Sequence, residues 1–335
     1  MKFDVKIMKF FRNMAVVSVF VFSFQSCKKE AVKNWNAEIK NPVQNIEFTD
    51  LSKELYDPAV SLETFKSKYP WFQGTVTDED FEIRRKDPEE IKIYKEAIAK
   101  IDQTKLKKEL TSLFSHIAFY FPEFKAPKVY LYSSALQGIS EPIIYHPQNN
   151  FLFIDITGFM GEKDANYKGV ETYFTLSMNP SNIVPKVSQI LAEQFVPYDA
   201  GHQKFIDLIV YQGKLMTLQD AFLPELPDYL KINYTKEQYD WAVSNEVNIW
   251  DYFVENDLIF SDDERLTDRF IAPGPFSKFY TEIDNESSPQ VGIFTGWQIC
   301  RKFYKEKPET PLADFLKMDA QTIFNQAVYK PKYTE

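Results

Sequence analysis

The residues with the clearest chemical spacing lie in the stretch 190–199, ILAEQFVPYD. Glu193 follows Ala192, and Val196 stands four positions after that alanine. Histidines at Ala192 and Val196 would complete H-E-x-x-H, in which two histidines on one helix face bind zinc and the glutamate acts on a zinc-bound water. Neither a methyl nor an isopropyl group offers a lone pair to a metal. We therefore expect no catalytic zinc here, and an ordinary solvated or ion-paired Glu193.

Other candidate metal ligands are scattered. Gluzincin-type peptidases carry a third ligand, a glutamate just before a glycine, on the next helix; here Gln212 precedes Gly213, and an uncharged amide is a poor zinc ligand. The three histidines, His116, His146 and His202, are not at ligand spacing from one another. We interpret them as ordinary helix or loop residues, and we expect neither a metal nor another cofactor.

The N-terminus carries an export signal. Four basic residues up to Arg12 precede a mainly apolar stretch over 14–24. At 1.5 Å per residue, its eleven residues are too few to cross about 30 Å of hydrocarbon. This pattern predicts a signal peptide over 1–26, and translation could begin at Met1 or at Met8. The stretch SFQSC ends in Cys27 and resembles a bacterial lipobox, in which the cysteine becomes the acylated first residue of the mature chain.

Acyl chains on Cys27 would hold the protein at a membrane. The alternative is a conventional signal peptide that an incidental cysteine follows. Residues 27–45 are polar and form a plausible tether, and 46–335 are expected to form a single globular domain, because no linker-like composition follows residue 45. The remaining cysteine, Cys300, has apolar neighbours and is expected to be a buried, unreactive thiol.

Composition excludes some classes of function. The formal net charge is −9 and no lysine–arginine stripe appears, so there is no electrostatic reason to expect a nucleic-acid partner. Ten glycines in 335 residues argue against a phosphate-cradling loop protein, whereas 44% hydrophobic residues suffice for a sizeable core.

The patterning predicts an α+β fold that is predominantly helical, with a small central sheet. Asp87 and Pro88 form a helix start. A later helix, which Pro122 ends, carries an apolar stripe on one face: Leu106, Leu110, Leu113, Phe114 and Ile117. Gly292 and Gly296, four apart, would permit close approach of another backbone. Strands are expected over 128–136 and 150–159, with Asp155 interrupting the second, and helices over 181–196, 201–222, 235–256, 265–271 and 292–306.

Four stretches together resemble a known family: IVPKVSQILAEQFVPYD, the segment from IVYQGKLM to LIFSDD, FIAPGPFSKF and GIFTGWQICRKFY. They are similar to the gliding-motility-associated lipoprotein B family (GldB) of Bacteroidota. The resemblance implies a degenerate, gluzincin-like metallopeptidase fold whose zinc-ligand positions hold Ala192, Val196 and Gln212, and therefore no enzyme. It also implies a role in gliding motility coupled to type IX secretion, with other envelope proteins as partners. Lys28 and Lys29 replace the acidic cluster associated with surface export in this phylum, so we expect a periplasm-facing domain.

Two other functions stay open at this point. One is an envelope hydrolase that uses Glu193 with a second carboxylate, Asp199 or Glu246. The other is a lipid-tethered small-molecule binding protein, with the aromatic-rich region 234–260 lining a pocket.

Overall fold

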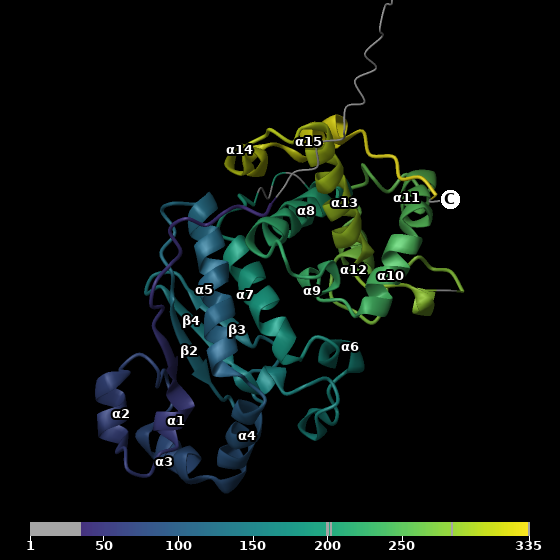
Figure 1. Ribbon diagram of the computed structural model, residues 1–335. Coiled ribbons are helices and arrows are strands. Elements are labelled where there is room, and N and C mark those ends of the chain that lie inside the picture. Colours follow the sequence, from purple (N-terminus) through teal and green to yellow (C-terminus); the bar gives the residue numbers. More distant parts are fainter. Residues whose placement is uncertain (1–34, 199–200, 202, 283, 334–335) are drawn as a thin grey trace, which may run out of the picture. The chain divides into compact units, whose positions relative to one another are not determined.

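A computed structural model describes residues 35–198, 201, 203–282 and 284–333 (Figure 1). The predicted signal peptide 1–26, the predicted lipidation site Cys27, Asp199 and His202 lie outside these residues. The described part is α+β and mostly helical around one small sheet, as the sequence predicts. Among the described helices, none combines the length and apolarity that a membrane span requires.

The sheet has four strands in the order β1-β2-β4-β3. Strands β1 (Phe48–Asp50), β2 (Lys128–Tyr132) and β4 (Phe151–Asp155) run parallel, and β3 (Ile143–His146) lies antiparallel at the edge beside β4. Strand β3 is missing from the sequence-based expectation. Its four residues stand between two prolines, too short a run for a period of two to be visible.

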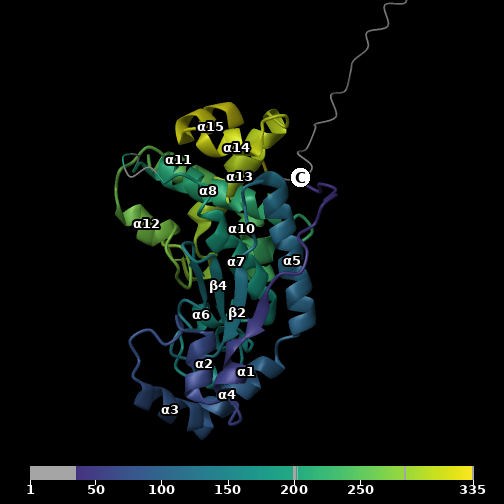
Figure 2. The ribbon, with the colours of Figure 1, turned by 90° about the vertical axis from the view of Figure 1, so that its left-hand side faces the viewer.

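Both faces of the central strands are covered, because successive side chains of a strand point to opposite faces. On one face, Leu131 and Ile154 join a core that includes residues of α5 (Gln103–Tyr120) and α7 (Ile183–Ala192). On the other, the aromatic rings of Tyr130 and Phe153 stack at 5.5 Å beneath α1 (Leu51–Leu55), α2 (Leu62–Lys68) and α3 (Asp78–Lys86). Figure 2 shows these layers from the side.

Several helix starts and stripes agree with the sequence. The Asp87 carboxylate accepts the N–H groups of Glu89 and Glu90, and Pro88 begins α4 (Pro88–Ala99). In α5, the predicted stripe is buried along its whole length and faces the sheet: Leu106, Leu110, Leu113, Phe114 and Ile117.

Several predicted elements need correction. The strand expected over 128–136 ends at Tyr132, and the helix expected over 201–222 begins at Phe205. Of the helix expected over 181–196, only α7 forms a regular α-helix, and it ends at Ala192. After it, the Phe195 N–H donates to the Ala192 carbonyl in a tighter turn. The strand expected over 150–159 ends at Asp155, whose carboxylate accepts the Thr157 N–H and starts a 3₁₀ turn. The helix expected over 235–256 breaks at Asn245, whose side-chain amide donates to the Trp241 carbonyl.

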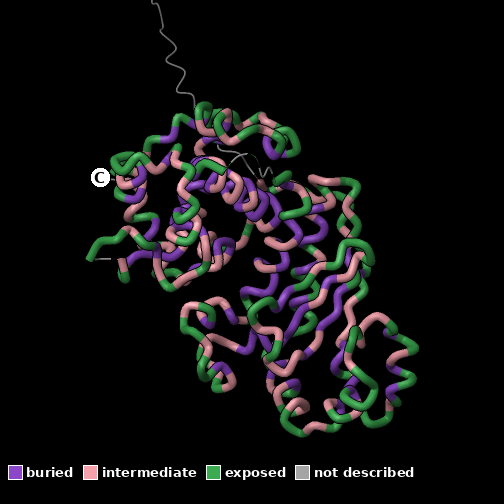
Figure 3. Tube along the Cα trace, turned by 180° about the vertical axis from the view of Figure 1, so that it is seen from behind, coloured by how far each residue is buried: buried purple, intermediate pink, exposed green. Residues whose placement is uncertain are grey.

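The remaining helices follow the sheet along the chain. They are α6 (Thr172–Thr175), α8 (Phe205–Phe222), α9 (Asp228–Lys231), α10 (Lys236–Ser244), α11 (Glu246–Glu255), α12 (Arg265–Phe270), α13 (Val291–Glu306), α14 (Leu312–Lys317) and α15 (Ala320–Ala327). Buried residues concentrate on the sheet and the inner helices, and exposed residues on the outer loops (Figure 3).

Helices α8 and α13 pack along much of their length at glycine positions. A methyl group on Gly296 would lie 1.7 Å from the Ile209 carbonyl oxygen, and one on Gly213 would lie 2.2 Å from the Gly296 carbonyl oxygen. On Gly292, it would lie 2.8 Å from the Phe270 carbonyl oxygen. The close backbone approach expected at Gly292 and Gly296 is therefore confirmed.

Candidate functional site

A hollow of about 580 Å³ contains the two polar positions singled out from the sequence, Glu193 and Gln212. We call it the α7–α8 hollow. Its walls come from α7, α8, the segment before β3, and loops that flank α10 and α13. Apolar side chains make up much of the lining, among them Pro142, Phe174, Ile190, Leu215 and Ile293.

One face of α7 lines this hollow and the other face enters the core. Lys186, Gln189, Ile190 and Glu193 line the hollow at the spacing i, i+3, i+4, i+7, which places them on one side of a helix. Ala192, by contrast, is fully buried in the main core. Val196, beyond the end of α7, is buried there too, at 4% exposure.

The geometry therefore separates Ala192 and Val196 from Glu193 and Gln212. A zinc-peptidase motif presents its first ligand, its base and its second ligand at i, i+1 and i+4. In the hollow, this spacing is found at Gln189, Ile190 and Glu193. These positions lie three residues before the corresponding positions of the sequence motif, which begins at Ala192. Their amide, alkyl and carboxylate groups do not form a zinc ligand set with Gln212.

Lys186 is the most unusual charge in the α7–α8 hollow. Burial lowers the pKa of its ammonium group to about 8. Its Nζ lies 5.8 Å from the centre of the Phe159 ring, and it forms no hydrogen bond or ion pair with another described residue. A cation that is partly removed from water without an anionic partner is poised to bind one.

The other polar groups of this hollow differ in how firmly they are held. Gln189 donates to the Lys231 carbonyl at 3.0 Å and accepts from the Asn233 amide at 2.8 Å. Gln212 has no hydrogen bond with another described residue. Glu193 lies at the rim, where partial burial raises the pKa of its carboxyl group although the residue as a whole is exposed. Lys186, Gln212 and Glu193 are thus available to a ligand, as is the exposed carboxylate of Glu141, which also lines the hollow.

The described residues contain no group of three or more His, Cys, Asp or Glu that could hold a metal ion. Nδ1 of His116 bonds the Ser112 carbonyl of its own helix at 2.9 Å, and His146 is exposed at the end of β3. Cys300 is fully buried, and burial raises the pKa of its thiol to about 12, as expected of an unreactive cysteine.

The residues of the two open alternatives meet only in part at the α7–α8 hollow: Glu193 and Tyr234 line it, whereas Asp199 lies outside the described residues. Glu246 accepts a hydrogen bond from Tyr329 at 2.7 Å and lines a different hollow. Trp250 packs edge-on against Tyr329 at 4.9 Å, and Phe253 is buried in the core. Neither aromatic residue lines either of these two hollows.

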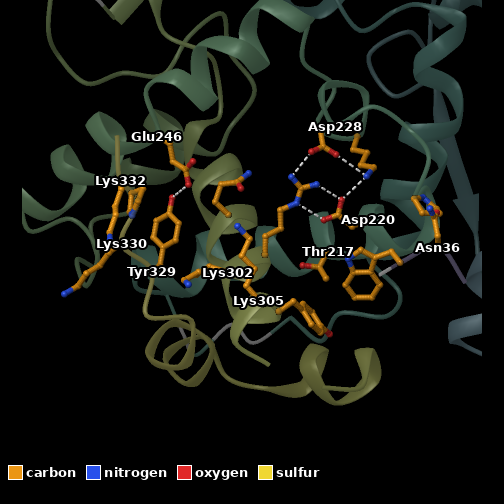
Figure 4. Close-up of a pocket in the computed structure, with 17 residues that line it drawn as sticks. Asn36, Thr217, Asp220, Asp228, Glu246, Lys302, Lys305, Tyr329, Lys330 and Lys332 are labelled. Carbon is orange, nitrogen blue, oxygen red and sulfur yellow. Dashed lines mark hydrogen bonds and ion pairs between the residues drawn. The ribbon is translucent and has the colours of Figure 1, made fainter. Parts of the chain in front are cut away.

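That second hollow, of about 730 Å³, contains a charged cluster that the sequence analysis missed (Figure 4). Asp220 on α8 accepts hydrogen bonds from Lys231 at 2.9 Å, from Arg301 at 2.7 and 2.9 Å, and from the Trp297 indole at 2.8 Å. Arg301 and Lys231 also contact Asp228. The one available signal was the position of Asp220 and Arg301 within otherwise apolar helix faces.

Electrostatics identify this cluster as structural. Burial alone would raise the pKa of Asp228, but the hydrogen bond and charge of Arg301, with those of Lys231, outweigh it and lower that pKa to about 2. The Asp228 carboxylate thus stays ionised, and both carboxylates are fully hydrogen-bonded. The Arg301 guanidinium stacks 3.7 Å from the centre of the Trp297 ring. The cluster ties α8, α9 and α13 together.

Comparison with known protein families identifies the family of this chain. The family model described as gliding motility protein GldB matches residues 32–331, which is most of the chain. No curated protein and no solved structure matched the chain. The sequence stretches that resemble this family all lie within the matched range, and the chain therefore belongs to the GldB family of gliding motility proteins.

Proposed function

We propose that this protein is a lipid-anchored envelope lipoprotein of the gliding machinery, linked to type IX secretion, which works as a non-catalytic protein-binding scaffold on a degenerate gluzincin-like fold. The family match and the lipobox-like Cys27 support the anchoring and the cellular role. The observation that carries the scaffold role is the α7–α8 hollow, where the ligand-spaced positions hold Gln189, Ile190 and Glu193.

The chemistry of this hollow suits recognition of a peptide segment. Its apolar walls can bury side chains of a partner, and the Phe174 ring at its edge is 42% exposed. The Lys186 ammonium and the Gln212 amide, which have no hydrogen-bond or ion-pair partner among the described residues, can take up a carboxylate or a backbone carbonyl of that partner. A few polar groups among apolar walls are typical of binding sites.

One observation favours the alternative of an envelope hydrolase. Glu193, with a raised pKa, and Lys186, with a lowered one, line the same hollow, and such opposed shifts occur at acid–base sites. They stand seven residues apart in the sequence, and no hydrogen bond or ion pair joins their side chains. We therefore rank the scaffold first.

Gene replacement in a gliding bacterium tests the proposal, with colony spreading as the readout and protein amounts checked by immunoblot. We expect Cys27→Ala and Lys186→Glu each to abolish spreading, the first by loss of the anchor and the second by repulsion of the partner. Glu193→Gln should spread normally, because it retains the shape and polarity of the rim. The matched charge control is Lys168→Glu at an exposed position, which should also spread normally.

The result that contradicts the scaffold role is a loss of spreading in Glu193→Gln at normal protein amounts. It would favour the hydrolase. Normal spreading in Lys186→Glu would show that no partner binds at the α7–α8 hollow.

A further inference from the structure

The described chain begins at the second hollow, close to the proposed anchor. The Trp35 ring packs edge-on against Tyr304 at 5.0 Å and Tyr120 at 6.1 Å, and Trp35 and Asn36 both line this hollow. Cys27 stands eight positions before Trp35. Because an extended chain spans at most about 3.6 Å per residue, an anchor at Cys27 keeps Trp35 within roughly 30 Å of the membrane.

Exposed lysines gather at the same place. Lys305 at the end of α13, and Lys330 and Lys332 in the segment after α15, are exposed, line the second hollow, and form no ion pair with another described residue (Figure 4). We call these three residues the lysine rim. A fourth lysine, Lys302, is paired with Glu306.

The acidic groups of the second hollow already have partners, and none of them forms an ion pair with the lysine rim. Asp220 and Asp228 are held by Arg301 and Lys231, and Glu246 by Tyr329. The sequence adds Lys28, Lys29 and Lys33 between Cys27 and Trp35. This concentration of positive charge contrasts with the net charge of −9 of the whole chain.

We propose that the lysine rim docks onto anionic lipid headgroups of the membrane that carries the anchor, and so fixes the orientation of the domain. The inference rests on the proposed function for the anchor alone. Each lysine near an anionic membrane surface raises the membrane-binding constant about fivefold, so three lysines raise it on the order of a hundredfold. The acidic remainder of the molecule is repelled by the same surface, so that only this rim approaches it closely.

Docking in this way has a consequence for the opposite end of the molecule. Figures 1 and 2 both place α3 and α4 at the end away from α13, α14 and α15. Contact through the lysine rim would hold α3 and α4 away from the membrane, free of the headgroups. Lys92 and Lys95, exposed on α4, therefore serve as an internal control.

The experiment couples the chain 27–335 to vesicles through the Cys27 thiol and a maleimide lipid. Cys300 does not compete, because its thiol is buried. Accessible amines are then acetylated by a water-soluble succinimidyl ester, and the rate at each lysine is read by mass spectrometry. We compare vesicles that contain one third anionic phospholipid with neutral vesicles. On the anionic vesicles, we expect the labelling rate of the lysine rim to fall by about fivefold or more, which is the factor by which one lysine raises membrane binding. Labelling of Lys92 and Lys95 should not change.

Variants make the result specific. In Lys305→Glu/Lys332→Glu, the protection of Lys330 should disappear, whereas the matched pair Lys92→Glu/Lys95→Glu should retain it. Equal labelling on both kinds of vesicle would overturn the proposal, and so would protection that is already complete on neutral vesicles. Protection by inorganic phosphate alone, without anionic lipid, would assign the rim to a free anion instead. Since the coupling is chemical, none of these outcomes depends on whether Cys27 is acylated in the cell or on the colony-spreading result.

Discussion

Glu193 and Gln212 line the same hollow, whereas Ala192, the direct neighbour of Glu193, is fully buried on the other side of α7. The side of α7 on which a residue lies therefore decides whether it can meet a ligand. The sequence pattern centred on Ala192, Glu193 and Val196 combines residues from both sides.

This arrangement predicts which substitutions can create a zinc site. In Gln189→His/Glu193→His/Gln212→Glu, three metal-binding side chains would line the α7–α8 hollow at ligand spacing. We expect this variant to bind about one zinc per chain, measured by isothermal titration, with a modest loss of stability of about 1 kcal/mol because Gln189 gives up its hydrogen bonds.

The matched variant is Ala192→His/Val196→His/Gln212→Glu. It should bind no zinc in the hollow and should lose about 1–3 kcal/mol or more, because the two imidazoles are forced into a packed core. If this second variant bound zinc and the first did not, positions 192 and 196 would be the ones that face the hollow, contrary to the structure.

Lys186 should make the stability of the protein depend on alkaline pH. In the unfolded chain its pKa is near 10.5, and in the folded chain it is lowered to about 8. Between these values the unfolded state holds more protons, so this lysine makes stability rise with pH from about 8 to about 10.5. Lys186→Met should therefore stabilise the protein at pH 7 by at most about 3 kcal/mol and flatten the profile above pH 8.

Urea unfolding at a series of pH values checks this, with Lys168→Met at an exposed position as the control. A destabilised Lys186→Met, or an unchanged slope above pH 8, would mean that the ammonium group has an anionic partner in the folded protein.

The buried charges around Asp220 should contribute strongly to stability. Asp220→Ala leaves Lys231, Arg301 and the Trp297 indole without their shared acceptor. Breaking a buried network of this kind costs about 3–5 kcal/mol. Asp240→Ala, which breaks an exposed pair with Lys236, should change the urea midpoint little. Equal effects of the two substitutions would show that the cluster is open to water.

The glycine crossing of α8 and α13 should not accept even a methyl group. Gly296→Ala places its Cβ against the Ile209 carbonyl oxygen, and the two helices must separate to admit it. We expect a loss of about 1–3 kcal/mol or more, seen as a lower melting temperature. Gly274→Ala, where the nearest atom is 3.7 Å away, is the control and should melt close to the original protein. Similar melting of both variants would contradict the close crossing.

Local signals in the sequence were sufficient for part of this fold. The Asp87–Pro88 start of α4 and the apolar stripe of α5 are fixed by residues within one or two turns, so both were predicted with little error. Strand β3 depends on pairing with β4, and four residues carry no period by which to recognise it. Helix α7 ends at Ala192, four residues before the expected end at 196, which directly precedes Pro197.

The candidate site was predictable only in part, for a related reason. Glu193 and Gln212 were noticed because the H-E-x-x-H pattern draws attention to that region. Lys186 belongs to no motif, and its importance arises from walls that three distant segments supply. The same holds for Asp220 and Arg301, which stand 81 positions apart in the sequence and meet only through the packing of α8 on α13.

The measurement that tests the central claim most directly is the metal content of the purified, tag-free chain 27–335, by inductively coupled plasma mass spectrometry after incubation with zinc and desalting. Near-zero zinc per chain is the result expected of a scaffold whose α7–α8 hollow lacks a ligand set. About one zinc per chain, lost in Glu193→Gln, would contradict that account and identify the hollow as a metal centre.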